Sequence, residues 1–434
     1  MVEGTPNKVL VKDLAVHNWY RFVLSFPPHL VRHYVEKFST GEDSRVLDPF
    51  CGTGTILVEC KKLGVESVGI EAHPMTHFSS SVKVDWTPDP EGLLEHAEEV
   101  AESVRAELAT IGLDDNQGYD PHSLFGPWRG DKSPLQTLSD ESQRLLLKDS
   151  ISPLPLHKTL ALLNAINYRL SSKYKRHELL ALAKALVSSI SNLRFGPEVW
   201  VGPAKLDAAV ISPWLANVQN MASDLRQLRN LNSNSSGVRC ADSRRMVEVL
   251  EPASIDAVIT SPPYPNEKDY TRTTRLETVL LGFVHDRADL QALKRKLVRS
   301  NTRGIYKGDD DDQWIASHPE IQRIAESIEA RRIELGKTSG FERLYGRVTR
   351  LYFGGMARHL SDLRSILRPG AHLAYVVGDQ ASYLRVMIRT GQLLADIAES
   401  LGYEVSGIDL FRTRLATATK EQLREEVIVL KWPG

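Results

Sequence analysis

Cysteine is scarce in this sequence of 434 residues, which contains only three cysteines. Cys51, Cys60 and Cys240 lack the paired spacing of a zinc site, and they are too few for a disulfide scaffold. We therefore expect no structural metal, and we expect a reducing cellular compartment.

Long apolar runs are also missing. No segment approaches the roughly 20 apolar residues that a membrane-spanning helix needs. The first residues, MVEGTPNKVLVKDL, lack the basic segment and the apolar core of a secretion signal. The sequence therefore predicts a cytoplasmic protein that has no membrane partner.

Net charge is almost absent, with a formal value of -1 at pH 7. This balance excludes a global attraction to nucleic acid, so any such partner would have to be held by local basic patches. The length favours two or three domains, or one core with large insertions.

What the sequence does contain is an alternation of short strands and helices at both ends of the chain. A strand over residues 45–47 leads through a glycine-containing turn to a helix over about residues 55–63, and residues 67–72 form the next predicted strand. Such a β-α-β unit starts a parallel sheet. Before it, a helix is expected to begin at Pro27-Pro28.

Long helical patterns replace this alternation over residues 87–234, which predicts a large and mainly helical insertion. The alternation then resumes, with strands predicted over 237–242 and 256–260 and a helix over 243–250 between them. A second helical and basic stretch runs from Thr271 to about Leu367. A strand, a helix and two final strands that form a hairpin complete the chain.

The sequence thus predicts an α/β fold with a mostly parallel sheet, a C-terminal antiparallel hairpin and a large helical insertion. Its expected parts are residues 1–86, the insertion at 87–234, and residues 235–434, which include a helical and basic segment at 271–352.

The segment DPFCGTGT, Asp48 to Thr55, is the first of two that carry chemistry. Gly52 and Gly54 stand between a strand and a helix, where glycine lets a ligand approach the N–H groups that start the helix. Taken alone, such glycines fit a mere tight turn equally well. Glu71 ends the next strand about 20 residues on, where an acidic side chain binds ribose hydroxyls, and this favours an adenosine-containing ligand.

The second segment is TSPPY, Thr260 to Tyr264. Its residues follow a further strand of the same predicted sheet, at the edge where open α/β sheets bind ligands. Taken alone, two prolines and a tyrosine fit a stiff turn with a core aromatic residue. Their combination with DPFCGTGT favours the second half of one site.

DPFCGTGT followed by TSPPY resembles the amino-directed DNA methyltransferases, which use S-adenosyl-L-methionine to methylate N4 of cytosine or N6 of adenine. The segments SFPPHLVRHYVEKF, VGIEAHP, CADSRR, LRPGAHLAYVVGDQ and FRTR…EEVIVL are similar to that family as well, whereas the helical insertion is poorly covered. The resemblance implies a Rossmann-like class I methyltransferase sheet.

The resemblance also implies which residues bind the cofactor. Phe50, Gly52 and Gly54 would wrap its methionine part, Asp48 would lie near its amino group, and Glu71 would bind its ribose. The remaining implied residues are Phe26 and Pro27, which would close the pocket, together with Pro49 and Asp242.

Two roles are possible for Asp242. The family places an acidic residue here near the adenine amine. Capping of the helix predicted over 243–250 explains the same aspartate equally well.

The TSPPY corner suits transfer to an exocyclic amine. The lone pair of such an amine is delocalised into the base, so acceptors must draw its hydrogens away before the nitrogen can attack. The Ser261 hydroxyl and the Pro262 carbonyl are such acceptors, and the fixed φ angles of Pro262 and Pro263 hold them in place. The face of Tyr264 can stack on the base. These four residues are the predicted catalytic set.

A base inside a duplex cannot reach such a corner, which implies base flipping and a grip on the DNA backbone. The predicted contacts are Arg272, Lys294, Arg295, Lys296, Arg299 and Arg303. A second basic stretch, SSKYKRH at 171–177, is better explained as a solvated face. The target-recognition region is the helical insertion, the segment from about 271 to 352, or both.

Serine at the first position of the corner motif favours cytosine N4 over adenine N6 in this family. The expected partner is double-stranded DNA, joined by a cognate restriction nuclease if the protein serves in restriction-modification. An RNA methyltransferase and a non-catalytic DNA-binding subunit are the two rival classes. No RNA-binding module is recognisable in the sequence, and the loss of transfer in Ser261→Ala would exclude the subunit.

Overall fold

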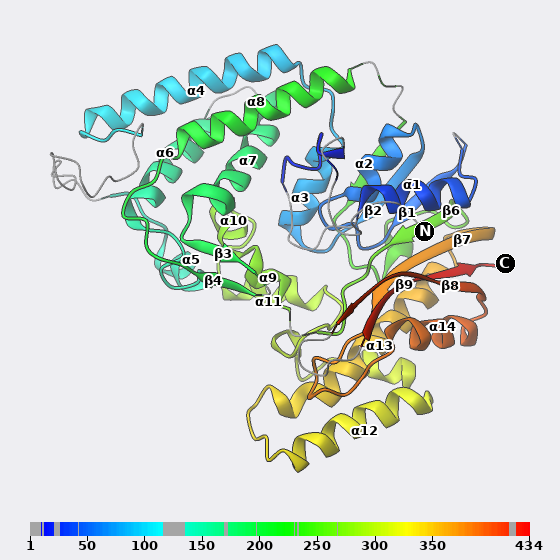
Figure 1. Cartoon of the computed structure of the whole chain (residues 1–434). Helices are drawn as coiled ribbons and strands as arrows, with labels where there is room; N and C mark the ends of the chain where they lie inside the picture. Colours follow the sequence, from blue (N-terminus) through cyan, green and yellow to red (C-terminus); the bar gives the residue numbers. More distant parts are fainter. Residues whose placement is uncertain are drawn as a thin grey trace.

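The computed structural model describes residues 10, 13–20, 27–41, 43–115, 135–168, 172–196, 198–229, 231, 234–266, 268–415 and 422–434. In these parts, helices cover both faces of a central sheet, and a helical region extends from one side (Figure 1). Within the same parts, no helix is both long and apolar enough to cross a bilayer.

The central sheet has seven strands in the order β5-β2-β1-β6-β7-β9-β8. The first five are parallel neighbours, whereas β9 runs antiparallel to both β7 and β8. The mostly parallel sheet and the C-terminal antiparallel hairpin are thus confirmed. The strands are β1 Arg45–Asp48, β2 Glu66–Ile70, β5 Ser236–Arg239, β6 Ile255–Thr260, β7 Leu367–Gly378, β8 Glu404–Leu415 and β9 Gln422–Lys431.

The central strands are apolar on both sides, and for this reason both faces of the sheet need a helical cover. On β6, Ala257 and Ile259 share a core with side chains of α1 and α2, whereas Val258 shares the opposite core with α13 and α14. Burying each large apolar side chain in this way contributes roughly 1.5–3 kcal/mol to the free energy of folding. The four covering helices are α1 Pro28–Lys37, α2 Thr55–Lys62, α13 Tyr345–Leu363 and α14 Thr390–Ser400.

The helical region begins with α4, where Asp89 accepts a hydrogen bond from the Gly92 N–H at 2.9 Å and Pro90 occupies the first turn. Its core, with Leu93 and Trp214, continues into Met75 of α3, so it joins the flank of the sheet. The predicted boundaries of the insertion remain predictions. α3 covers Pro74–Lys83, and the elements of the helical region are α4 Pro90–Thr110, α5 Asp140–Leu145, α6 Pro153–Tyr168, α7 Ser172–Ala185, a π-helix Leu186–Ile190 and α8 Ile211–Leu228.

A short hairpin inside this region was not predicted. It consists of β3 Leu193–Phe195 and β4 Val199–Val201, which pair antiparallel. Three-residue strands lie below the length at which alternation can be recognised in a sequence.

The predicted helix over 243–250 is wrong. The only helical turn there is a 3₁₀ turn, Met246–Glu248. The carboxylate of Asp362, on α13, accepts hydrogen bonds from the Met246 and Val247 N–H groups at 2.5 and 3.3 Å. A tertiary partner therefore satisfies donors that an α-helix would have needed to satisfy internally.

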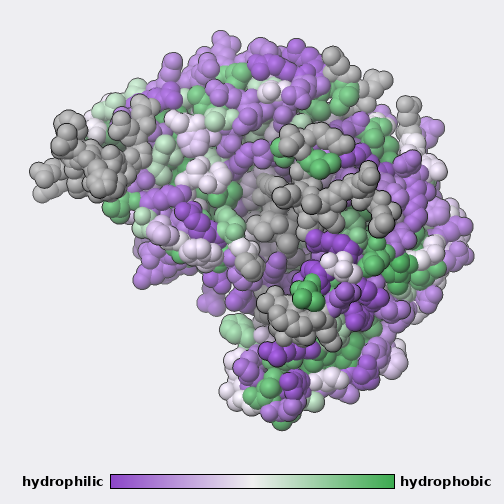
Figure 2. Space-filling model, in the orientation of Figure 1, coloured by the Kyte–Doolittle hydropathy of each residue, from purple (hydrophilic) through white to green (hydrophobic). Residues whose placement is uncertain are grey.

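The segment between β6 and α13 is helical and basic, as expected, and it ends in a second projecting part that carries α12. Figure 2 shows that the outline of the molecule is notched between this part and the helical region. The elements are α9 Tyr270–Thr273, α10 Arg275–Leu280, α11 Arg287–Arg295, the 3₁₀ turns Thr302–Gly304, Asp311–Ile315 and Glu342–Leu344, and α12 Pro319–Glu334.

Candidate active site

The two motifs meet because their strands are neighbours in the sheet. β1 and β6 pair in parallel, with Leu47 opposite Val258, so their carboxyl ends lie at the same edge. Asp48 ends β1 and Thr260 ends β6, and the Thr260 hydroxyl donates a 2.7 Å hydrogen bond to Oδ1 of Asp48. Two residues that are 212 positions apart in the chain are thus joined by a buried hydrogen bond.

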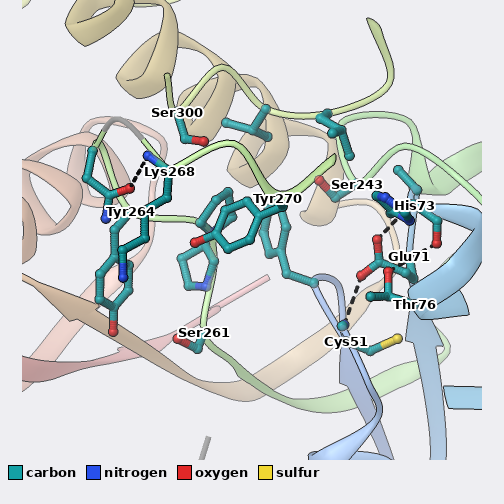
Figure 3. Close-up of a pocket in the computed structure, with 18 of the residues that line it drawn as sticks. Cys51, Glu71, His73, Thr76, Ser243, Ser261, Tyr264, Lys268, Tyr270 and Ser300 are labelled. Atoms are coloured by element: carbon teal, nitrogen blue, oxygen red, sulfur yellow. Dashed lines mark hydrogen bonds between the residues drawn. The ribbon is translucent and has the colours of Figure 1, made fainter. Parts of the chain in front are cut away.

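A cavity of about 870 Å³ opens at this edge of the sheet. Figure 3 shows Ser261 and Tyr264 on one side and Glu71, His73 and Thr76 on the other, with Tyr270 between them in this view. The predicted residues that line the cavity are Pro27, Asp48, Pro49, Phe50, Gly52, Glu71, Ser261, Pro262, Pro263, Tyr264, Lys294, Lys296 and Arg299. Those that the structure describes but places outside the lining are Gly54, Asp242, Arg272, Arg295 and Arg303, while Phe26 lies outside the described residues.

The two glycines of the first motif have different structural roles. Gly52 has a φ of +51°, and a Cβ at its position would meet nothing within 4 Å, so its missing side chain leaves open space. Gly54 has a φ of +82°, and a Cβ there would lie 2.9 Å from Cβ of Ser80. Gly54 therefore allows α2 and α3 to pack closely, whereas Gly52 leaves room at the cavity.

The Glu71 carboxylate braces the glycine turn from the neighbouring strand. Oε2 accepts a hydrogen bond from the Gly52 N–H at 2.9 Å, and Oε1 accepts one from the His73 N–H at 2.7 Å. Burial raises the pKa of Glu71, although these N–H donors counteract it. Each oxygen has a second lone pair that can still accept a hydrogen from a ligand.

Asp48 is the least exposed of the carboxylates that line the cavity. Burial raises its pKa to about 7, although hydrogen bonds from Thr260 and from the Phe50 N–H lower it and Glu71 raises it further. An aspartate of this kind changes charge near neutral pH, so it can distinguish a cationic ligand group from a neutral one.

The proline corner is held from two sides. The Ser261 hydroxyl donates to the main-chain oxygen of Val376 on β7 at 3.2 Å, which orients its remaining lone pairs. Tyr264 lies against Gly378, where an added Cβ would be 3.1 Å from Cε2 of the ring and 3.3 Å from Cγ of Glu425. The absence of a side chain at Gly378 thus makes room for the tyrosine ring.

Comparison with known proteins finds DNA methyltransferases that are similar to this chain. A family model for N6- and N4-directed enzymes, described as DNA methylase, matches residues 7–78. The Type II methyltransferase M.BsoBI of Geobacillus stearothermophilus is 24% identical over 446 aligned positions, which cover 94% of this chain and 83% of that protein. The Type II methyltransferase M.AvaI of Anabaena variabilis is 25% identical over 448 positions, covering 97% and 87%. These matches support membership of the amino-directed DNA methyltransferase family.

A further relative in this family is similar over a shorter stretch. The Type II methyltransferase M.MjaII of Methanocaldococcus jannaschii is 34% identical over 70 residues, which cover 16% of this chain and 13% of that protein. The similarity to M.BsoBI and M.AvaI, in contrast, extends through the helical region as well as the sheet.

The side chain of Asp242 binds Arg244, two residues further along the same turn. At this position the methyltransferase family implies an adenine contact. Oδ1 of Asp242 accepts from the main-chain N and the Nε of Arg244, both at 2.9 Å, and its Oδ2 accepts from Nη2 at 2.6 Å. The aspartate therefore caps a turn, though not the predicted helix. Ala241 and Ser243, on either side of it, do line the cavity, and an adenine contact by Asp242 remains a prediction.

The basic residues predicted to hold DNA have two kinds of surroundings. Arg299 is only 4% exposed, because its guanidinium binds both carboxylate oxygens of Asp309 at 2.8 Å and donates to the carbonyls of Lys294 and Leu297. Lys294 pairs with Asp269 at 2.9 Å. The exposed basic residues of the set are Arg295, Lys296 and Arg303.

Several residues that line the cavity were not predicted. Arg412 and Arg414, which are two residues apart on β8, both line it, and Arg412 binds Glu425 of β9 through two hydrogen bonds of 2.5 and 2.7 Å. The segment FRTR did carry a signal, because spacing by two places both arginines on one face of a strand. Lys268 and Glu198 complete this rim, and Glu198 had no sequence signal at all.

Proposed function

We propose that the protein transfers a methyl group from S-adenosyl-L-methionine to the exocyclic N4 amine of cytosine in duplex DNA, as the modification enzyme of a restriction-modification system. The observation that carries this proposal is the bond between Asp48 and Thr260. It joins the start of the DPFCGTGT motif to the start of the TSPPY corner, and residues of both motifs line one cavity.

The cavity fits the proposed cofactor in size and in chemistry. Its volume of about 870 Å³ is typical of a cavity that accepts a nucleoside-sized ligand. Glu71 offers two acceptors for ribose hydroxyls, the open space at Gly52 leaves the main chain approachable, and Asp48 offers a carboxylate for an ammonium group. When bound, S-adenosyl-L-methionine supplies an electrophilic methyl carbon on a sulfonium.

The chain's own contribution to transfer lies at the corner. Because the Ser261 hydroxyl gives its hydrogen to Val376, its oxygen is left to accept one amine hydrogen, and the Pro262 carbonyl accepts the other. These acceptors draw electron density onto the amine nitrogen, and the two prolines hold them in place without reorganisation. Tyr264, seated beside Gly378, presents an aromatic ring to the base.

Duplex DNA is proposed to lie in the notch between the helical region and the part that carries α12 (Figure 2). The exposed residues Arg295, Lys296 and Arg303 are the proposed phosphate contacts, because exposed cations can exchange counterions for phosphates. Arg299 instead braces this segment through Asp309 and is left out of the proposed contacts.

The methylated base is the most direct test of the proposal. DNA from a host that expresses the protein should contain N4-methylcytosine at one short sequence, detected by mass spectrometry of nucleosides and by sequencing that distinguishes the two modified bases. N6-methyladenine instead would overturn the cytosine assignment, and methyl groups found only in RNA would overturn the DNA assignment.

Binding of the cofactor should weaken in acid. With a pKa of about 7, Asp48 is ionised above that pH and becomes neutral below it, so its attraction for an ammonium group is lost as the pH falls. We expect the dissociation constant, measured by calorimetry, to rise about 10-fold from pH 7 to pH 5.5. Asp48→Asn should flatten this profile. Asp256→Asn, which changes an aspartate at the opposite end of β6, should keep it, and an equal slope in Asp48→Asn would contradict the assignment.

A further inference from the structure

The β3–β4 hairpin has one buried face and one exposed face. Leu193 and Val199 are 3% and 4% exposed and belong to the core of the helical region. Arg194 and Trp200 lie directly opposite each other on the other face, and Trp200 is 54% exposed. An aromatic side chain of this size is normally buried, so its place on the outer face needs an explanation other than packing.

The hairpin is held firmly at its base. The Asn192 N–H donates to the carbonyl of Ser150 at 2.8 Å, and the Gly202 N–H donates to the carbonyl of Asn192 at 2.7 Å. The Asn192 side chain donates to Asp149 and Ser152 and accepts from the main chain of Lys205. Trp200 is therefore presented on a fixed support.

The free end of the hairpin lies at the mouth of the cavity. Glu198, which directly precedes β4, lines the cavity together with Lys268, between the TSPPY corner and α9, and Arg414 of β8. Burial lowers the pKa of Lys268, while Glu198 opposes the change and Arg414 adds to it, so these charges are close together. Along an extended strand, Trp200 is two residues, or about 7 Å, from Glu198. The indole is thus close to the place where a flipped base would enter.

From these contacts we infer that the hairpin inserts Trp200 into the DNA base stack, in the gap that the extruded target base leaves. This inference rests on the proposed function. Extrusion costs the duplex its pairing and stacking at one position, and an aromatic ring that stacks on the neighbouring bases recovers part of that cost. Arg194, beside Trp200 on the same face, is suited to contact a phosphate next to the gap. The basic rim of Lys268, Arg412 and Arg414 continues this surface into the cavity.

The test compares Trp200→Ala and Trp200→Phe with the wild-type protein. Single-turnover methylation is measured on duplexes with the target base either paired or opposite an abasic site, at the sequence mapped in the host DNA. We expect Trp200→Ala to slow methylation of the paired duplex about 10-fold or more, since one base–aromatic stack is lost. The rate on the duplex with the unpaired target should stay within about 3-fold of wild type, because extrusion of an unpaired base requires little free energy. Trp200→Phe should keep most of the rate on both duplexes.

The control is Leu63→Ala, since Leu63 is another large apolar side chain on the surface, 45% exposed, at the end of α2 and outside both candidate target-recognition regions. It should leave both rates unchanged. Equal slowing of Trp200→Ala on both duplexes would overturn the inference, and so would no slowing on either. A Trp200→Ala variant that changes only the sedimentation of the protein would overturn it in favour of a contact between two copies of the chain.

Failure of the proposed function can be told apart from failure of this inference. If the wild-type protein methylates no DNA, the proposed function fails by itself. The inference is then decided by tryptophan fluorescence on DNA addition: quenching that disappears in Trp200→Phe supports insertion, and quenching that persists contradicts it.

Discussion

Replacing Ser261 with alanine should lower the rate of methyl transfer about 10²-fold while cofactor affinity stays unchanged. The hydroxyl is one of two acceptors proposed for the amine hydrogens, and loss of one preorganised partner of a reacting group typically costs this much. The bond to Val376 that is also lost contributes only about 1 kcal/mol to stability. Single-turnover kinetics, calorimetry with the cofactor and urea denaturation measure the three quantities separately.

Ser254→Ala is a suitable control for this experiment. Ser254 directly precedes β6, at the end of the strand opposite Ser261, and its exposed hydroxyl bonds the carbonyl of Glu251. It should retain the wild-type rate. If Ser261→Ala also retains it, the corner does not act on the amine, and the mechanism proposed for this cavity is wrong.

Gly354→Ala should have the largest effect on stability, lowering the free energy of unfolding by about 3 kcal/mol. Gly354 lies on α13, and a Cβ at its position would overlap the main-chain oxygen and carbon of Asp311. Backbone atoms of two packed elements cannot yield as a flexible side chain can. Urea denaturation of the variant against wild type measures the difference.

The same change should also disturb the segment that carries the proposed DNA contacts. Asp311 binds Arg244 and Arg358, and Arg244 in turn donates to the carbonyl of Arg295. Gly340→Ala is the control, because a Cβ there would meet nothing within 4 Å. A Gly354→Ala protein as stable as Gly340→Ala would show that α13 and the turn at Asp311 separate without cost.

The central elements of the fold were predictable because their signals are local. The run IDAVIT predicts a strand by its β-branched and apolar residues, and β6 covers Ile255–Thr260. Pro28 in the first turn marks the start of α1. The turn at Gly52 and Gly54 likewise follows from residues that are adjacent in the chain.

The surroundings of the charged residues were not predictable, since they depend on partners far away in the chain. Arg299 looked like one more member of a basic stretch, but Asp309 and nearby carbonyls bury it. The helix expected after Asp242 does not form because Asp362, more than a hundred residues away, takes its N–H groups. No window of local sequence contains such competitors.

By itself, the sequence determined the central strands, the helices next to them and the two motifs at the strand ends, because strand and turn preferences act over a few neighbouring residues. Only the tertiary structure decided that Asp48 and Thr260 touch and that the hairpin carrying Trp200 borders the cavity that the TSPPY corner lines. Those contacts depend on the order of the strands in the sheet. The pairing of each arginine with a carboxylate likewise depends on the packing of the whole chain.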